Sequence, residues 1–146
     1  MYGYVLQDWI TIRGSSIADV IQGESGWMGF SSFQDIVFWL DVREATFPTG
    51  GGTPSLTWYF ETSPTKDNNL FTPMSTATVS LATLTTPGVQ LLTGALPRVI
   101  LASGPAVPLA TWVRWRLSPA GTTAPPWDAT FRVLAAANRV VRGRVA

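Results

Sequence analysis

The stretch that indicates the fold class most clearly reads Asp35-Ile36-Val37-Phe38-Trp39-Leu40-Asp41-Val42-Arg43-Glu44. Large apolar side chains occupy every second position, and the positions between them mix apolar with charged residues. Because successive side chains of a β-strand point to opposite faces, this alternation predicts a half-buried central strand. Its inward face would carry Ile36, Phe38, Leu40 and Val42, and its outward face Val37, Trp39, Asp41 and Arg43.

The same alternation resumes in residues 55–62, where Leu56, Trp58 and Phe60 share one face. The connection before it, residues 48–54, contains three glycines and two prolines, which permit positive φ angles and stop ladder pairing. We therefore expect a loop between two neighbouring strands that pair antiparallel with each other.

Strand patterns recur over most of the chain, whereas helix patterns are weak. Residues 15–22 and 135–141 are compatible with a helical turn, but β-branched residues and short length disfavour one. About eight or nine strands at regular spacing predict an all-β chain that folds as a single antiparallel β-sandwich. We expect a jelly-roll-like strand order, and an immunoglobulin-like order is the alternative that alternation leaves open. The remaining predicted strands are residues 6–13, 26–33, 76–83, 89–93, 97–102, 111–117 and 129–135.

One domain of 15.8 kDa is large enough to bury an apolar core without disulfides or metal. We expect it to cover residues 1–136, with an N-terminal tail at residues 1–4. A basic C-terminal arm at residues 137–146 would then contain Arg139, Arg142 and Arg144. No apolar run is long enough to span a bilayer and no export signal opens the chain, so we expect a soluble protein.

The chain contains neither histidine nor cysteine, which excludes most near-neutral proton-transfer, thiol and transition-metal chemistry. We accordingly expect no cofactor and no metal site. The net charge of +1 provides no global field that would recruit nucleic acid or an anionic membrane. Charged residues make up only 13% of the chain, a composition that favours a protein docked to copies of itself or to a partner.

Paired carboxylates are the enzyme chemistry that survives this exclusion, because a glycosidase can work with two acids alone. Asp41 and Glu61 are the best candidates, since both are expected on the outward faces of neighbouring strands and could meet across the ladder. Arg43 and Arg114 are expected close by as charge partners. Surface charge pairing is therefore the favoured interpretation, and a two-carboxylate hydrolase is the alternative.

Seven tryptophans are a high number for this length. Trp58 and Trp115 fall on predicted core faces, and Trp127 falls in a predicted loop. An exposed tryptophan can anchor a protein interface or stack on a sugar ring, and each one could instead cover a sandwich edge. The candidate partner interface consists of Trp9, Trp27, Trp39, Trp112, Arg139, Arg142 and Arg144.

Four stretches resemble the small β-sandwich accessory proteins of tailed-bacteriophage heads, the decoration or cement class. They are Gln34-Asp35-Ile36-Val37-Phe38-Trp39-Leu40-Asp41-Val42, Trp58-Tyr59-Phe60-Glu61-Thr62-Ser63-Pro64, Trp112-Val113-Arg114-Trp115-Arg116-Leu117 and Ala129-Thr130-Phe131-Arg132-Val133-Leu134. The resemblance implies a non-enzymatic virion protein that binds the outer capsid surface across capsomer joints and stabilises the head.

On the same resemblance, the partner would be the major capsid protein, and the chain would form dimers or trimers without specific nucleic acid or membrane. It would assemble in the host cytoplasm and end on the capsid surface of the virion. A phage tail or neck structural protein is one alternative. A carbohydrate-binding β-sandwich module is the other, since it would use the same exposed tryptophans.

Overall fold

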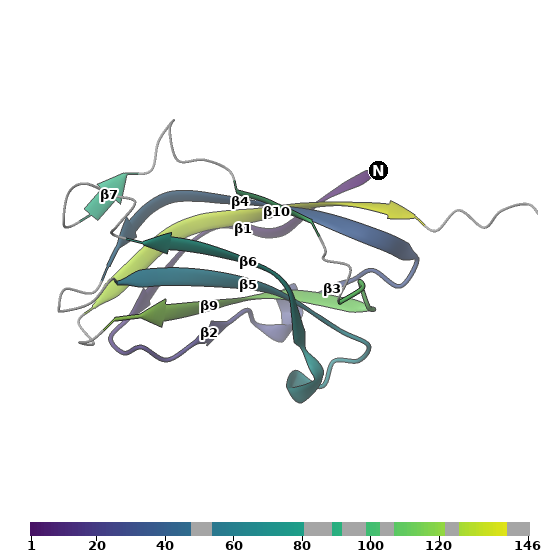
Figure 1. Ribbon diagram of the computed structural model, residues 1–146, viewed down its shortest axis with the longest axis horizontal. Coiled ribbons are helices and arrows are strands. Elements are labelled where there is room, and N and C mark those ends of the chain that lie inside the picture. The colour runs from purple at the N-terminus through teal and green to yellow at the C-terminus, as the bar shows by residue number, and fades with distance from the viewer. Residues whose placement is uncertain (48–53, 81–88, 92–98, 103–106, 122–125, 140–146) are drawn as a thin grey trace, which may run out of the picture.

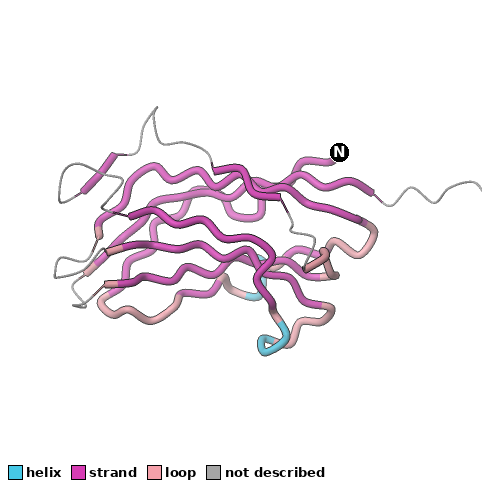
Figure 2. The backbone as a smooth tube through the Cα atoms, viewed as in Figure 1, coloured by secondary structure: helices cyan, strands magenta, loops and turns pink. Residues whose placement is uncertain are grey.

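Two antiparallel β-sheets lie face to face in the computed structural model of the chain (Figures 1 and 2). The structure describes residues 1–47, 54–80, 89–91, 99–102, 107–121 and 126–139. The first sheet, called the β4 sheet here, contains β1 (Tyr2–Gly14), β4 (Phe33–Thr46), β7 (Val89–Leu91), β8 (Val99–Ala102) and β10 (Trp127–Arg139). The second, called the β5 sheet, contains β2 (Val20–Ile21), β3 (Met28–Gly29), β5 (Ser55–Ser63), β6 (Thr72–Ser80) and β9 (Trp112–Ala120).

The order of the strands identifies a jelly roll. In the β4 sheet, β10 lies between β1 and β4, and both β7 and β8 pair with β4. In the β5 sheet, β9 lies between β5 and the short strands β2 and β3, and β6 pairs with the other side of β5. Of the six long strands in the described residues, only β5 and β6 are consecutive in the chain and paired in one sheet. An immunoglobulin-like sandwich keeps more consecutive strands together, so the jelly-roll order is the one this chain adopts.

The prediction that β4 and β5 pair antiparallel with each other is wrong. These strands lie in different sheets, because β5 pairs with β6 and β9 while β4 pairs with β10, β7 and β8. The alternation in both strands is nevertheless as predicted, since each buries one face in the space between the sheets. Alternation indicates which face is buried, and either arrangement of the two strands satisfies it.

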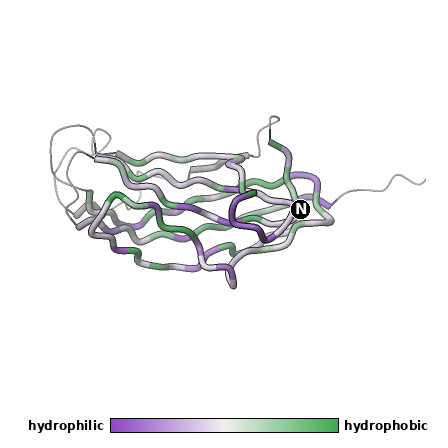
Figure 3. The backbone as a smooth tube through the Cα atoms, turned by 90° about the horizontal axis from the view of Figure 1, so that it is seen from below, coloured by the Kyte–Doolittle hydropathy of each residue, from purple (hydrophilic) through white to green (hydrophobic). Residues whose placement is uncertain are grey.

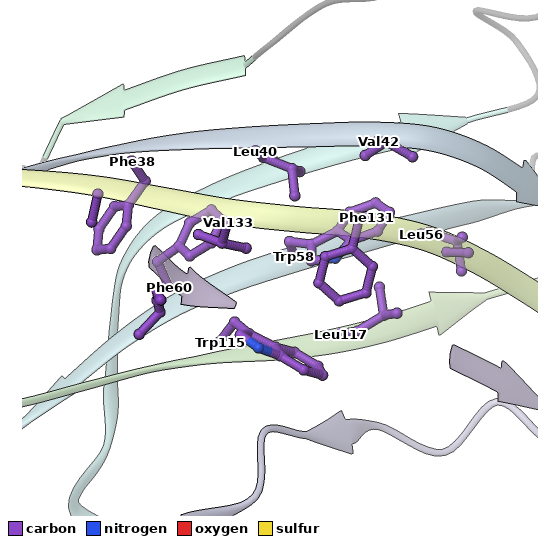
Figure 4. Packing of buried hydrophobic residues seen from close by; sticks show 14 of the residues in the cluster. Phe38, Leu40, Val42, Leu56, Trp58, Phe60, Trp115, Leu117, Phe131 and Val133 are labelled. Carbon is purple, nitrogen blue, oxygen red and sulfur yellow. The ribbon is translucent and has the colours of Figure 1, made fainter. Parts of the chain in front are cut away.

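The core lies between the two sheets and is dominated by aromatic rings (Figure 4). Phe38 of the β4 sheet stacks on Phe60 of the β5 sheet, with ring centroids 4.6 Å apart and planes 13° apart. Trp58 and Trp115 both make edge-to-face contacts with Phe131, with ring centroids 5.4 and 5.1 Å apart. Both tryptophans were expected in the core, and they are 0% and 2% exposed. Apolar and polar segments alternate along the strands as this packing requires (Figure 3).

The strands extend into both ends of the chain. β1 begins at Tyr2, within residues 1–4, which were expected to form a tail. Its first three residues pair with Ala135–Ala137 of β10. β10 begins at Trp127 and ends at Arg139, so residues 135–139, part of the segment compatible with a helical turn, are strand. The prediction of a loop at Trp127 is wrong, because this residue begins β10. Trp127 is 2% exposed, and its indole N–H donates to the carbonyl oxygen of Ser16 at 2.8 Å.

Two connections contain short 3₁₀ helices that alternation could not indicate, η1 (Glu24–Gly26) and η2 (Asn68–Leu70). The strand expected over residues 26–33 is reduced to β3, and residues 15–22 contain bends followed by β2 instead of a helical turn. Among the described residues, no helix has the length and apolar character needed to cross a bilayer.

Candidate interaction surface

The outer face of the β4 sheet carries a cluster of uncharged side chains, called the apolar patch. Cross-strand register aligns Val5, Leu134 and Trp39 in one row and Gly3, Ala136 and Val37 in the next. The intervening residues Phe38 and Ala135 are buried in the core, so the patch residues point outward. Val5 is 56% exposed, a high value for a large apolar side chain.

A shallow hollow of about 550 Å³ lies within the patch. Its lining includes Gly3 of β1 and Ala136 of β10, which have little or no side chain. Trp39, from β4, also lines it. The complete lining is Gly3, Tyr4, Val5, Trp39, Arg132, Leu134, Ala135 and Ala136.

Two polar pairs border the patch along the strands. At one end, Arg132 of β10 forms an ion pair with Asp41 of β4 at 2.9 Å, and its guanidinium lies 4.8 Å over the ring of Trp9. At the other end, the side-chain amide of Asn138 donates to Asp35 Oδ1 at 2.9 Å. The described outward side chains between these two pairs carry no charge, which is the composition of the centre of a protein interface.

The outer face of the β5 sheet is different, because it carries a buried charged cluster. Glu61 Oε2 accepts from Arg114 Nε at 2.9 Å, and Glu61 Oε1 accepts from Arg116 Nε at 2.7 Å. Arg116 also pairs with Asp19 at 2.6 Å. Arg114 and Glu61 are each 3% exposed. Their charges satisfy each other within the fold, so this cluster offers little to a ligand.

Aromatic rings from two connections cover the cluster. The guanidinium of Arg114 lies 3.8 Å over the ring of Phe71 and 5.1 Å over that of Trp27, and it also donates to Asn68. Burial by itself lowers the pKa of Arg116, but hydrogen bonds and charge from Glu61 and Asp19 outweigh it and raise that pKa above its ordinary value. The guanidinium therefore keeps its charge.

The prediction that Asp41 and Glu61 meet across neighbouring strands is wrong. Asp41 lies on the outer face of the β4 sheet and Glu61 on the outer face of the β5 sheet, so the core separates them. Arg114 is a partner of Glu61, as expected, while Asp41 pairs with Arg132. Two carboxylates on opposite sides of a sandwich cannot act on one glycosidic bond, which overturns the two-carboxylate hydrolase. No group of three potential metal-ligating side chains occurs in the described part of the chain.

The structure disperses the tryptophans of the predicted interface. Trp9 and Trp39 lie on the outer face of the β4 sheet, where Trp9 is 41% exposed beneath Arg132. Trp27 packs on Phe71 at 4.7 Å and donates to the carbonyl oxygen of Gln22 at 2.8 Å. Trp112 lies on the other side of the molecule, with Lys66 Nζ 4.5 Å from its ring centroid. Trp9 and Trp39 therefore share one face, whereas Trp27 and Trp112 lie on the side of the β5 sheet.

Of the three arginines in the predicted interface, one lies in the described part of the chain. Arg139 is exposed, and its guanidinium lies 4.8 Å over the ring of Tyr2 at the end of the sandwich. Arg142 and Arg144 lie outside the described residues.

The sequence analysis did not identify Val5, Gly3 and Ala136 as members of the patch. The available signal was Leu134, a large apolar residue at an outward position of a strand whose alternation is otherwise regular.

No protein-family model matches the chain, and no curated protein matches it in sequence. Among solved structures, the chain is similar to the VP2 subviral particle of infectious bursal disease virus, with a TM-score of 0.50 and 11% identity over 94% of this chain. It is also similar to the structure of the Gx strain of infectious bursal disease virus, with a TM-score of 0.47 and 12% identity over 97% of this chain. The chain spans 32% of the length of each of these chains. The first likeness shows a shared fold.

Proposed function

We propose that the protein is a non-enzymatic structural protein of a virus particle, which binds the outer capsid surface and stabilises the head. The observation that carries the proposal is the apolar patch on a jelly-roll sandwich. Jelly rolls serve both in viral capsids and in lectins, and a fold alone does not choose between them. The choice comes from the chemistry of the exposed face.

That chemistry favours a protein partner over a sugar. Sugar recognition needs several polar groups that converge beside an aromatic ring, because each hydroxyl must be hydrogen-bonded. Trp39 lines the hollow, and only two of the other lining residues, Arg132 and Tyr4, have polar side-chain atoms. Arg132 is already held by Asp41. A partner that buries apolar area would gain free energy here without leaving hydroxyl groups unpaired.

The absence of catalytic activity is part of the proposal. The chain has no histidine or cysteine, and its two candidate carboxylates lie on opposite outer faces, each bound to arginine. The proposed partner is the major capsid protein, and the proposed location is the capsid surface after assembly in the host cytoplasm. No specific nucleic acid or membrane is involved. A tail or neck position in the particle is the nearest variant of this function.

The experiment begins with particles purified from cells that express the chain. An antibody raised against the pure protein should label them, and electron microscopy should place the label on the head. Particles stripped of the protein should release their genome at lower temperature, and added protein should restore them. Label at the tail or neck would support that variant, and particles that contain none of the chain would overturn a virion role.

The lectin alternative has its own measurement. A glycan array probed with the labelled wild-type protein and with a Trp39→Ala variant should show no binding that depends on Trp39. Glycan binding that this substitution abolishes would replace the virion proposal with a carbohydrate-binding function.

A further inference from the structure

We infer that the apolar patch is covered by a second copy of this chain, in a twofold dimer whose two β4 sheets pack face to face. The inference rests on the proposed function, and it deepens that function by assigning the patch to the contact between two copies of the chain. The resulting dimer would then bind the major capsid protein through surfaces other than the patch. The twofold axis would run parallel to the strands, between β4 and β10. In that arrangement β4 of one copy faces β10 of the other.

The first support is the shape of the central row. Across this row, Val5 and Leu134 lie beside the hollow, and Trp39 lies on the β4 side of it. A twofold axis parallel to the strands reverses the order of the row in the second copy. Trp39 of each copy is then placed over Leu134 and the hollow of the other, so that one feature fills its own complement twice.

The second support is charge complementarity across the same axis. Within one copy, Asp41 lies on β4 and Arg132 lies directly opposite on β10. The axis places Asp41 of each copy against Arg132 of the other, which forms an alternating cluster of two acids and two bases. A twofold axis perpendicular to the strands would instead place β4 against β4, and Asp41 would face the acid Asp35. Like charges in contact disfavour that packing.

Sheet geometry permits the arrangement. Two sheets that pack face to face keep their strand directions within about 30° and lie about 10 Å apart. An axis parallel to the strands preserves strand direction and satisfies this condition. Val5 and Trp9, which are 56% and 41% exposed, both lie on β1 at the edge of the patch. The contact would therefore continue onto this edge.

The first experiment measures self-association by analytical ultracentrifugation of the pure, full chain. We expect a dimer for the wild type, and at least a tenfold rise in Kd for Val5→Lys and for Leu134→Lys. The matched control is Leu70→Lys, which adds the same charge at an apolar residue that is 48% exposed on the η2 connection. Circular dichroism would verify that each variant is folded. A monomeric wild type, a trimer, or equal effects of Val5→Lys and Leu70→Lys would overturn the proposal.

The second experiment tests the predicted pairing itself. The double variant Asp41→Arg/Arg132→Asp keeps the ion pair within each copy and reverses its direction. It should dimerise with itself, since acids again face bases. Mixed with wild type, it would place acid against acid and base against base. Native mass spectrometry should then show mixed dimers at least fivefold below the statistical proportion. Statistical mixing would overturn the assigned axis. If the antibody labels the particles but the pure chain is monomeric, the dimer is overturned and the proposed function stands.

Discussion

Gln22 and Trp115 are joined by two hydrogen bonds that run in opposite directions. The backbone N–H of Gln22 donates to the carbonyl oxygen of Trp115 at 3.1 Å, and the backbone N–H of Trp115 donates to Gln22 Oε1 at 3.2 Å. The amide nitrogen of the same side chain donates to the carbonyl oxygens of Leu6 and Gly26, at 2.9 and 3.0 Å. Gln22 thus connects β1 of one sheet to β9 of the other and closes one edge of the sandwich.

Gln22→Met should lower the free energy of unfolding by about 2 to 4 kcal/mol, because it leaves several buried backbone groups without partners. Urea denaturation monitored by tryptophan fluorescence would measure the change. Gln34→Met is the control, since Gln34 is exposed on β4, and it should change stability by less than about 0.5 kcal/mol. Equal effects at the two positions would contradict the assigned role of Gln22.

Glu61→Ala should cost about 3 to 5 kcal/mol, since it leaves the buried guanidinium of Arg114 without a counter-charge. The control is Glu24→Ala, which breaks an exposed pair with Lys66 at 3.7 Å and should cost at most about 1 kcal/mol. Thermal unfolding followed by circular dichroism would compare the two. If Glu61→Ala unfolded at the wild-type temperature, the buried Arg114 would not depend on Glu61 as its counter-charge.

Gly14→Ala should destabilise the protein by about 1 to 3 kcal/mol, because the added Cβ would lie 2.5 Å from ring atoms of Trp127. Gly23→Ala is the matched control, since nothing lies within 4 Å of its Cβ position and its φ of −59° suits any residue. Both variants would be measured by urea denaturation. A neutral Gly14→Ala would show that the ring of Trp127 can move aside.

The Phe38–Phe60 stack should be visible in a double-mutant cycle. Each change to leucine should cost less than the about 3 to 5 kcal/mol of a Phe→Ala change, and the coupling energy should be about 0.5 to 1.5 kcal/mol. A second cycle that combines Phe38→Leu with Trp127→Phe provides the comparison. Ala135 of β10 faces Phe38, and Trp127 begins the same strand far from that position, so these effects should add within about 0.5 kcal/mol. Coupling of equal size in both cycles would contradict a specific contact.

The sequence predicted correctly which way a side chain points where a single strand carries the information. The alternation around Trp39 and Arg132 places both residues outward, and the structure confirms this. It fails where a connection folds over a face. Glu61 occupies an outward position as predicted, yet it is 3% exposed because Trp27, Asn68 and Phe71 enclose its partner Arg114. Loop paths of this kind leave no periodic signal in the sequence.

Two properties of this protein follow from its sequence alone: the all-β class and the inward face of each regularly alternating strand. Both depend on the period of two, which every strand imposes on its own side chains. Only the tertiary structure decided which strands are neighbours, so it alone separated β4 from β5, parted Asp41 from Glu61, and aligned Val5 with Leu134 and Trp39. The physical reason is that pairing uses backbone N–H and C=O groups, which every residue other than proline provides alike. Side-chain alternation therefore selects a face, whereas the choice of neighbour depends on packing across the whole sandwich.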